Sequence, residues 1–325
     1  MDTIKRFPTF ALLAVMLLVV ACGGASGTLG SLPPTSAAPS LSTASAEPDL
    51  TPGSSPSPTT VPSVEPSASA PMTSPSASPG ETMIVRTYFI LDGAPGSEGL
   101  VPTLAEVPKS TGVASAAMTA LLAGVPSGDG YSTVSTAIPA GTGLIGLTIK
   151  NGIATVDLST EFDSGGGSAS QQYRLAQVVY TLTQFTSVKS VVFQIEGQTV
   201  TVFGSEGIVL AGSVGRADFT AQLPSIFVDR PAFGAAIGNP ARVTGSADVF
   251  EATFRMSLLD ASGKTLVDRQ VMATCGSGCR GTFDVTLTYA VTKGQWGTLH
   301  VYNPSAKDGT PEDIRDYPVW LTPAG

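Results

Sequence analysis

The sequence contains one histidine and three cysteines, and these few residues limit the catalytic and metal chemistry open to it. His300 lies in an alternating run from Trp296 to Tyr302, which is typical of a β-strand, so we interpret it as a strand residue. A zinc site needs about four ligands, more than one histidine and a cysteine pair supply. The chain also contains no G-x-S-x-G, H-E-x-x-H or P-loop motif. We therefore predict no catalytic residue, no metal and no cofactor.

Clustered carboxylates offer a route to catalysis that needs no histidine. Asp157, Glu161 and Asp163 follow each other closely, and a pair of carboxylates can hydrolyse a glycosidic bond. They also lie at the end of a predicted strand and in the turn after it, where turn chemistry explains them adequately. For Glu251 and Asp308 a cross-strand or turn role is likewise sufficient. We favour these structural roles and keep a carboxylate-dependent hydrolase as the second alternative function.

The first 21 residues have the parts of a secretory signal peptide. Lys5 and Arg6 precede an uncharged run from Phe10 to Ala21, which is short for a membrane-spanning helix of about 20 apolar residues. The sequence Val-Val-Ala-Cys that ends at Cys22 resembles the lipobox of bacterial lipoproteins. This resemblance implies cleavage before Cys22, palmitate-type acyl chains on it, and anchoring to the extracytoplasmic face of the cell membrane. The alternative is an ordinary signal peptide followed by an incidental cysteine.

Cys275 and Cys279 lie in a glycine-rich segment between two predicted strands. Thiols outside the cytoplasm tend to oxidise, and a three-residue spacer in a hairpin loop lets the two Cβ atoms reach disulfide distance. We predict a disulfide between them, with free thiols or half of a metal site as the alternatives. A ring this small should stabilise the fold only modestly.

The net charge of the chain argues against nucleic acid as a partner. The sequence carries 17 lysines and arginines against 25 aspartates and glutamates, a net charge of −8, and no basic run relieves it. Proteins that bind nucleic acid present a basic patch or stripe to the phosphates. We therefore exclude DNA and RNA as partners.

Residues 22–81 differ in composition from the rest of the chain. Proline, serine, threonine, alanine and glycine dominate this stretch, and it contains no aromatic residue, lysine or arginine. Such a segment buries too little apolar surface to offset the entropy of ordering it. We predict a disordered tether that holds the folded part away from the membrane.

Residues 82–212 are predicted to form an α+β domain. An Asn151-Gly152 pair between two strand-like runs indicates a hairpin, and the apolar spacing after Ser168 or Ser170 indicates a helix. The expected order is β-α-β-β-α-β-β, with the helices packed on a small mixed sheet. The predicted strands are 83–91, 144–150, 153–158, 191–195 and 199–202, and the predicted helices are 110–122 and about 168–185.

Residues 225–323 show no helical period and are predicted to form an all-β immunoglobulin-like sandwich. Seven short β-rich runs are spread over roughly 100 residues, the spacing typical of such sandwiches. The runs are 226–228, 241–249, 253–259, 265–272, 281–289, 296–302 and 317–321. The seam between the two domains is expected near residues 211–216.

Short segments of both domains resemble known families. Five segments of the first, which begin at Leu121, Ala137, Ala154, Tyr180 and Gln194, read LLAGVP, AIPAGT, ATVDLS, YTLTQF and QIEG. In this order they resemble the GerMN domain of sporulation and spore germination proteins. The second domain, with NPARVTGSA at 239–247 and SAKDG at 305–309, resembles the Gmad-type immunoglobulin-like domain of bacterial spore germination.

The resemblance implies a non-enzymatic role in assembling a cell-envelope complex. The GerMN domain is similar to ring-building folds of secretion and sporulation machineries, which implies association with envelope proteins and with further copies of the chain. The first alternative is a cell-wall or glycan-binding module that uses Trp296 and Trp320. Exposed tryptophans would favour that alternative, whereas tryptophans that face the sandwich core would count against it.

Overall fold

The computed structural model describes residues 80–93 and 98–324. The predicted signal peptide, Cys22 and nearly all of the predicted tether therefore lie outside the described residues. Both predicted domains belong to one compact unit, Thr73–Gly325, and the boundaries predicted for them stay predictions. None of the described helices combines the length and the apolar character needed to cross a membrane.

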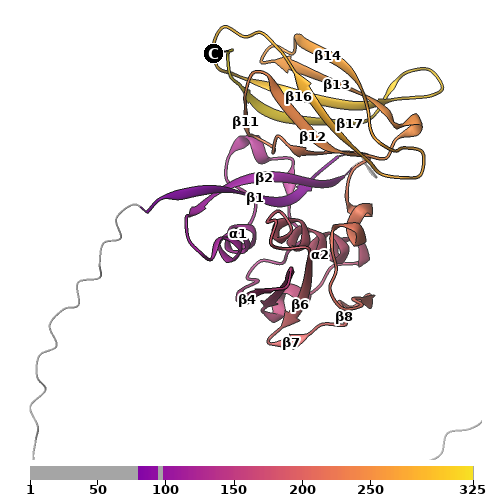
Figure 1. Ribbon diagram of the computed structural model, residues 1–325. Coiled ribbons are helices and arrows are strands. Elements are labelled where there is room, and N and C mark those ends of the chain that lie inside the picture. The colour runs from indigo at the N-terminus through magenta and orange to yellow at the C-terminus, as the bar shows by residue number, and fades with distance from the viewer. Residues whose placement is uncertain (1–79, 94–97, 325) are drawn as a thin grey trace, which may run out of the picture. The chain divides into compact units, whose positions relative to one another are not determined.

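The N-terminal half of this unit, residues 82–222, contains two larger sheets with two helices between them, and a separate two-stranded hairpin, β8–β9 (Val202–Phe203 and Ile208–Val209) (Figure 1). Its main elements are β1 (Thr82–Leu91), β2 (Gly99–Pro108), α1 (Val113–Leu122), β3 (Val134–Ser135), β4 (Leu144–Lys150), β5 (Ile153–Leu158), α2 (Ser168–Leu182), β6 (Ser190–Ile195) and β7 (Gln198–Thr199). One sheet has the order β2-β1-β3 and is antiparallel; the other has the order β4-β5-β6-β7, with β5 and β6 parallel. The predicted α+β class is confirmed.

Helix α2 is buried on nearly all sides because it lies between the two sheets. Leu175 and Leu182 are completely buried, and full burial of such a side chain stabilises the fold by roughly 1.5–3 kcal/mol. Two of its buried polar side chains are bonded to β1. The Gln177 side chain donates to the Tyr88 carbonyl over 3.0 Å, and Thr181 Oγ1 accepts the Tyr88 N–H over 3.2 Å. These bonds hold α2 against the strand.

Strand β2 corrects the predicted order of elements, since no predicted strand covers it. Pro102 and Pro108 obscure its pattern, because proline cannot donate a ladder hydrogen bond and is found mainly in edge strands. Strand β2 is an edge strand of its sheet. The Pro102 carbonyl accepts the N–H of Phe233 over 2.8 Å, a bond that joins β2 to the C-terminal half.

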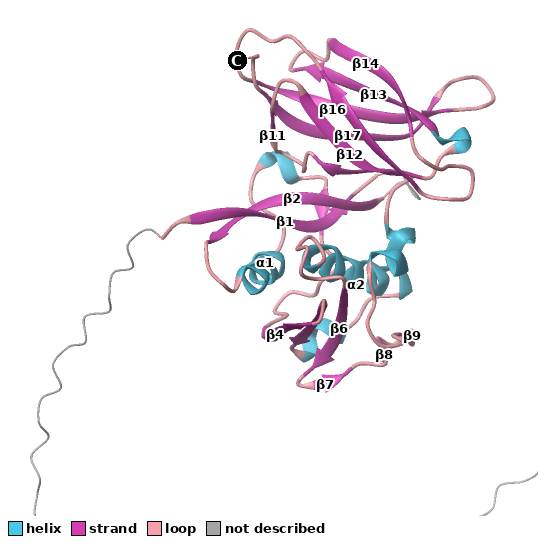
Figure 2. Cartoon of the chain, viewed as in Figure 1, coloured by secondary structure: helices cyan, strands magenta, loops and turns pink. Residues whose placement is uncertain are grey.

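The C-terminal half, from Ser225, is a sandwich of two sheets (Figure 2). One sheet contains β10 (Ile226–Arg230), β12 (Ala241–Ala247) and β15 (Gly281–Leu287), and the other contains β11 (Ala236–Ile237), β17 (Pro311–Leu321), β16 (Gln295–Pro304), β13 (Thr253–Asp260) and β14 (Thr265–Met272). Burial alternates strictly along β15. Phe254 of β13 meets Phe283 of β15 with ring centroids 5.0 Å apart. The predicted sandwich is confirmed, and all seven predicted runs contain strands.

A buried polar cluster joins the two halves. The Tyr88 hydroxyl donates to Asp229 over 2.6 Å, and Asp229 pairs with Arg86 at 3.9 Å and Arg216 at 3.7 Å. Burial, together with the charge of Asp229, raises the pKa of Tyr88 to about 12. The Arg216 guanidinium also lies 4.5 Å from the centre of the Tyr180 ring. We call these five residues the junction cluster. One continuous hydrophobic core runs through both halves around it.

Candidate functional site

Of the three cysteines predicted to have a role, two lie within the residues that the structure describes. Cys22 lies outside the described residues, so its lipidation stays a prediction. Cys275 and Cys279 form a disulfide in the loop between β14 and β15, with their Cα atoms 5.8 Å apart. This separation is ordinary for a disulfide. A Cβ at Gly281 would meet the backbone of Cys275, so the loop needs glycine beside the bridge.

The three clustered carboxylates hold separate turns. Asp157 accepts the N–H of Gly197 over 2.9 Å, and Asp163 accepts the N–H of Gly204 over 2.7 Å. Glu161 accepts a hydrogen bond from the Ser159 hydroxyl, which lowers the pKa of its carboxyl group. Glu161 therefore has a partner in its own turn, and Asp157 and Asp163 each hold a turn about 40 residues further along the chain, which supports structural roles over a shared catalytic role.

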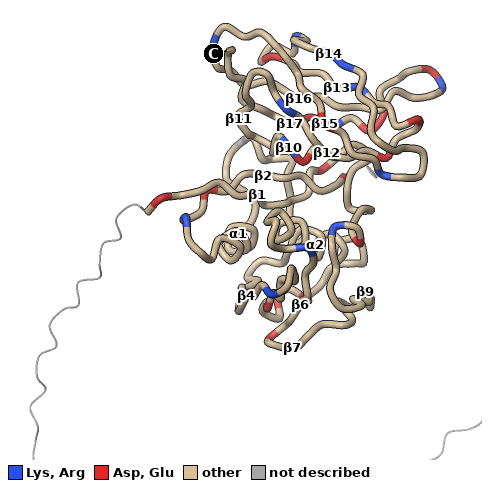
Figure 3. Tube along the Cα trace, in the orientation of Figure 1, with Lys and Arg blue, Asp and Glu red and all other residues tan. Residues whose placement is uncertain are grey.

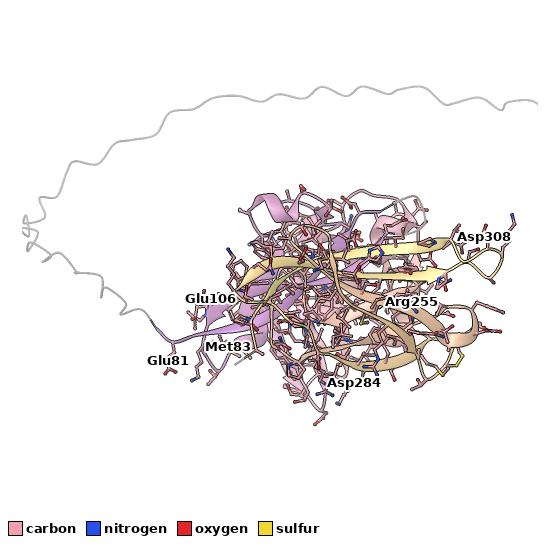
Figure 4. The ribbon with its side chains drawn as sticks, turned by 90° about the horizontal axis from the view of Figure 1, so that it is seen from above. Glu81, Met83, Glu106, Arg255, Asp284 and Asp308 are labelled. Atoms are coloured by element: carbon pink, nitrogen blue, oxygen red, sulfur yellow. A yellow bond between two sulfur atoms is a disulfide. The ribbon has the colours of Figure 1, made fainter. Side chains whose placement is uncertain are left out.

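Asp308 and Glu251 also lie in turns. Asp308, at the outer end of the β16–β17 loop in Figure 4, accepts the Thr310 N–H over 3.1 Å and the Thr310 hydroxyl over 2.7 Å. The hydroxyl bond, followed by the backbone bond, lowers the pKa of the Asp308 carboxyl group. Glu251 has a positive φ of 55°, and its N–H donates to the Ser277 hydroxyl over 2.9 Å.

His300 lies on the outer face of the larger sheet, in a row of polar side chains. Its Nδ1 lies 2.6 Å from Asp316 Oδ1 on β17, and Ser257 is its neighbour on β13. The Ser257 hydroxyl donates to Asp268 over 2.7 Å, and Arg255 pairs with the same carboxylate. Because this bond directs the Ser257 hydroxyl to Asp268 and not to His300, Ser257 and His300 do not form a nucleophile–base pair. The strand interpretation of His300 agrees with its place on β16, whereas its partners depend on a register that the sequence does not display.

Trp296 and Trp320 face solvent on the same outer face. They are direct partners across β16 and β17, with ring centroids 5.5 Å apart at an interplanar angle of 84°. Their exposed fractions are 52% and 37%. This exposure is the arrangement that we expected for a glycan-binding module, and the rings do not face the sandwich core.

A small cavity of about 390 Å³ lies beside Trp296 and is lined by residues from both halves. Tyr131 of the N-terminal half packs on Phe233 at 5.6 Å between ring centroids, and Pro318 lies opposite. We call Trp296, Trp320, Tyr131, Phe233 and Pro318 the aromatic corner. Sequence reasoning missed the last three, since only the packing of the two halves brings them to the tryptophans.

Three glycines complete the lining of this cavity. The remaining lining residues are Gly128, Gly130 and Gly234, which have no side chains to fill the space. Gly234 has a φ of 77°, and a Cβ there would lie 2.9 Å from the Tyr131 hydroxyl oxygen. Within residues 80–93 and 98–324, no three His, Cys, Asp or Glu side chains gather as metal ligands.

Two family models match the chain. Residues 86–201 match the model described as Germane, sporulation and spore germination, and residues 225–310 match Gmad2, the immunoglobulin-like domain of bacterial spore germination. The second match ends before β17, which continues to Leu321. Comparison with curated proteins gave no significant match.

Among solved structures, the chain is similar to the first GerMN domain of the sporulation protein GerM from Bacillus subtilis, with 26% identity, 42% of this chain and 99% of that chain covered, and a TM-score of 0.35. The tandem GerMN domains of the same protein match at 17% identity over 64% of this chain and 62% of theirs, with a TM-score of 0.35. A candidate lipoprotein from Clostridium perfringens matches at 21% identity over 42% and 89%, with a TM-score of 0.31. The domain assignment rests on the two family models. The chain therefore carries a Germane (GerMN-type) sporulation and spore germination domain followed by a Gmad2 immunoglobulin-like domain of bacterial spore germination.

Proposed function

We propose that this protein is a non-enzymatic lipoprotein, anchored by Cys22 to the outer face of the cell membrane, that acts as an assembly scaffold of an envelope complex. Sporulation and spore germination domains of this kind support the proposal. The lipobox-like sequence and the proline-rich stretch after it support an anchored, tethered arrangement. The charges in Figure 3 are of both signs and scattered, which is compatible with protein partners and not with a nucleic-acid groove.

The observation that carries the scaffold proposal is a pair of different apolar patches on the GerMN-type half. The first, the β4 patch, is the outer edge of strand β4 with its exposed Ile145 and Ile149, whose exposed fractions are 51% and 38%. Strand β4 is the edge strand of its sheet. Natural edge strands are usually protected by charge, proline or cover, and β4 has a single charged residue, Lys150, at its end.

The second patch lies beyond the other edge of the same sheet. The β8–β9 hairpin (Val202–Phe203 and Ile208–Val209) follows β7, and its Val202 and Val209 are 58% and 73% exposed. The flanking chain bonds to β6 on the side away from β5, through Val191 and Val214. We call Val202 and Val209 the hairpin patch. Two unlike patches at opposite edges suit head-to-tail contact between copies, which builds a ring when the rotation closes.

The test is the mass of the mature chain, residues 22–325 with Cys22→Ser, measured by light scattering over a concentration series. Wild type should grow in mass with concentration, whereas Ile145→Lys and Val209→Lys should each reduce association. Met272→Lys, at a 71% exposed position on β14, is the matched control and should associate like wild type.

Mixing the two variants distinguishes the geometry of the contact. Ile145→Lys retains the hairpin patch and Val209→Lys retains the β4 patch, so head-to-tail contact predicts a mixed dimer that grows no further. A mixture that stays monomeric would contradict the head-to-tail contact, whereas association of one variant by itself would indicate a symmetric contact through the patch that this variant retains. A wild type that is monomeric at all concentrations would refute self-association.

A further inference from the structure

We propose that the aromatic corner binds an uncharged glycan chain, with sugar rings stacked on Trp296 and Trp320. This site lies on the sandwich half, apart from the β4 and hairpin patches, and does not depend on self-association. Trp296 is 52% exposed and Trp320 37%, and the two rings are nearly perpendicular to each other. Tryptophan is highly buried on average, and contiguous exposed apolar patches often mark binding sites.

The stacking chemistry follows from the aromatic rings. The face of an indole ring carries partial negative charge, and the C–H groups on one side of a pyranose ring carry partial positive charge. Two indole rings at a right angle offer faces in two directions, so a chain of sugars that bends over the edge of the sheet can contact both. Tyr131 and Phe233 form the apolar wall behind Trp296.

The cavity has the composition of a small-ligand site. Such sites are concave, mostly apolar, and contain a few polar groups that orient the ligand. Here the walls are aromatic rings, Pro318 and three glycines, and the volume is about 390 Å³. The glycines allow a ring to approach the backbone closely. The Tyr131 hydroxyl, which lies close to Gly234, is the polar group at its wall.

A polar row continues the surface along the sheet. Thr298 and then His300 follow Trp296 on the outer face of β16, and His300 is bonded to Asp316. A strand rises by about 3.3 Å per residue, so His300 lies roughly 13 Å along the strand from Trp296. The surface is therefore longer than one sugar. It offers hydroxyl and imidazole groups in a row whose charges are paired, as for Arg255 and Asp268.

These features favour a glycan over a protein as the occupant. In protein–protein interfaces, the residues that contribute most to binding are often tryptophans, and they are surrounded by further contacts that exclude water. In the aromatic corner the exposed rings give way to glycines on one side and to a polar row on the other. That pattern of apolar stacking faces beside hydrogen-bonding groups matches the two kinds of surface on a sugar chain.

Tryptophan fluorescence reports on this site directly, because the chain contains only two tryptophans and both belong to the corner. The mature chain with Cys22→Ser would be titrated with an N-acetylglucosamine hexamer and with dextran, which are uncharged, and with cell-wall glycan strands freed of stem peptides, whose muramic acid carboxylates are charged. We expect a saturable change in emission with at least one of the uncharged glycans. Trp296→Ala and Trp320→Ala should each weaken binding roughly tenfold in a sedimentation assay, and Trp296→Phe should retain part of it.

Two controls separate this proposal from the scaffold proposal. Met272→Ala, on the same sheet outside the corner, should bind like wild type, and Ile145→Lys should lose association but retain glycan binding. The proposal is overturned if no uncharged glycan changes the emission, or if binding survives both alanine variants with their folds intact by circular dichroism. Binding that needs stem peptides, or capture of an envelope protein through the tryptophans without any glycan, would also overturn it.

Discussion

Single residues of this chain separate into those with a structural explanation and those without one. Asp157 and Asp163 bond to backbone amides of glycines, and Asp308 bonds to Thr310, so turns account for these carboxylates. Trp296 and Trp320 contribute little to the sandwich core, since each exposes more than a third of its surface. Their exposure therefore calls for a functional explanation, which the glycan proposal supplies.

Cys22 is the residue on which membrane anchoring depends. Cys22→Ala should remove the lipid and move the protein from the membrane fraction to the soluble fraction, because two or more acyl chains are needed for stable anchoring. Cell fractionation and the mass of the mature N-terminal peptide measure both effects. The double variant Cys275→Ser/Cys279→Ser is the matched control and should stay in the membrane fraction. A Cys22→Ala protein that remains lipidated and membrane-bound would contradict the anchor.

At the scale of elements, two connections determine how the sandwich is assembled. The loop with Cys275 and Cys279 leads from β14 in one sheet to β15 in the other, so the bridge lies where the chain changes sheets. Strand β2 connects the halves through its Pro102 carbonyl. Neither connection is a regular hairpin: β2 contains two prolines, and the chain beside the bridge needs Gly281, where a Cβ would collide with the backbone of Cys275.

The disulfide loop yields a stability prediction. Mature Cys22→Ser protein should show no reactive thiol in denaturant before reduction and two after it. Cys275→Ser/Cys279→Ser should lower the free energy of unfolding by at most about 2 kcal/mol, because the closed ring is short. Urea unfolding of the oxidised protein, the reduced protein and the variant measures the change. Two thiols that react without reduction would show that the bridge does not form in solution.

At the scale of the whole molecule, the two domains behave as one body because they share a core and the junction cluster. Phe227 of the sandwich packs edge-on against Tyr180 of α2 with ring centroids 6.1 Å apart. The half-buried carboxylate of Asp229 would be an unpaired charge without Tyr88, Arg86 and Arg216 around it. Contact between the two domains places Tyr131 beside Phe233, which the aromatic corner requires.

The junction cluster makes the free energy of unfolding depend on pH in the alkaline range. The pKa of Tyr88 is raised from 10.0 to about 12, so the folded state holds the phenol proton more tightly than the unfolded state. Its contribution is complete below pH 10 and is lost as the pH rises toward 12. Tyr88→Phe should lower the free energy of unfolding by about 1.5–3 kcal/mol at pH 8, since it removes a hydrogen bond to a charged group.

The difference between wild type and Tyr88→Phe should narrow between pH 10 and pH 12, with urea unfolding at each pH as the measurement. Tyr302→Phe, on the surface of the sandwich and outside the junction cluster, should cost little at any pH. A Tyr88→Phe difference that stays constant up to pH 12 would contradict the raised pKa of Tyr88.

Local periodicity was sufficient to predict most elements. Strand β14 occupies the predicted residues 265–272, and helix α2 lies within the predicted range of about 168–185. The predicted cap, Ser168 or Ser170, is wrong by at least one residue, because the N-cap is Gly167 and Ser168 is the first residue of the helix. Strand and helix periods arise from the backbone itself, so a few neighbouring residues reveal them. Strand β2 was not predicted because its prolines break the alternating pattern. Strands β3 and β11 were not predicted because each is only two residues long, too short to show a period.

The sequence by itself determined the fold class, the family resemblance, the acidic character and the candidate lipid anchor, since each depends on residue type and on spacing along the chain. Only the tertiary structure decided which face of the sandwich carries Trp296 and Trp320, and that Tyr131 lies beside Trp296. It also decided that Asp229 of the sandwich bonds to Tyr88 of the N-terminal half. Those features depend on strand register and on contacts between residues about 100 or more positions apart. Local sequence patterns reveal neither the register nor the long-range contacts, because long-range pairing is selected by the packing of the whole core.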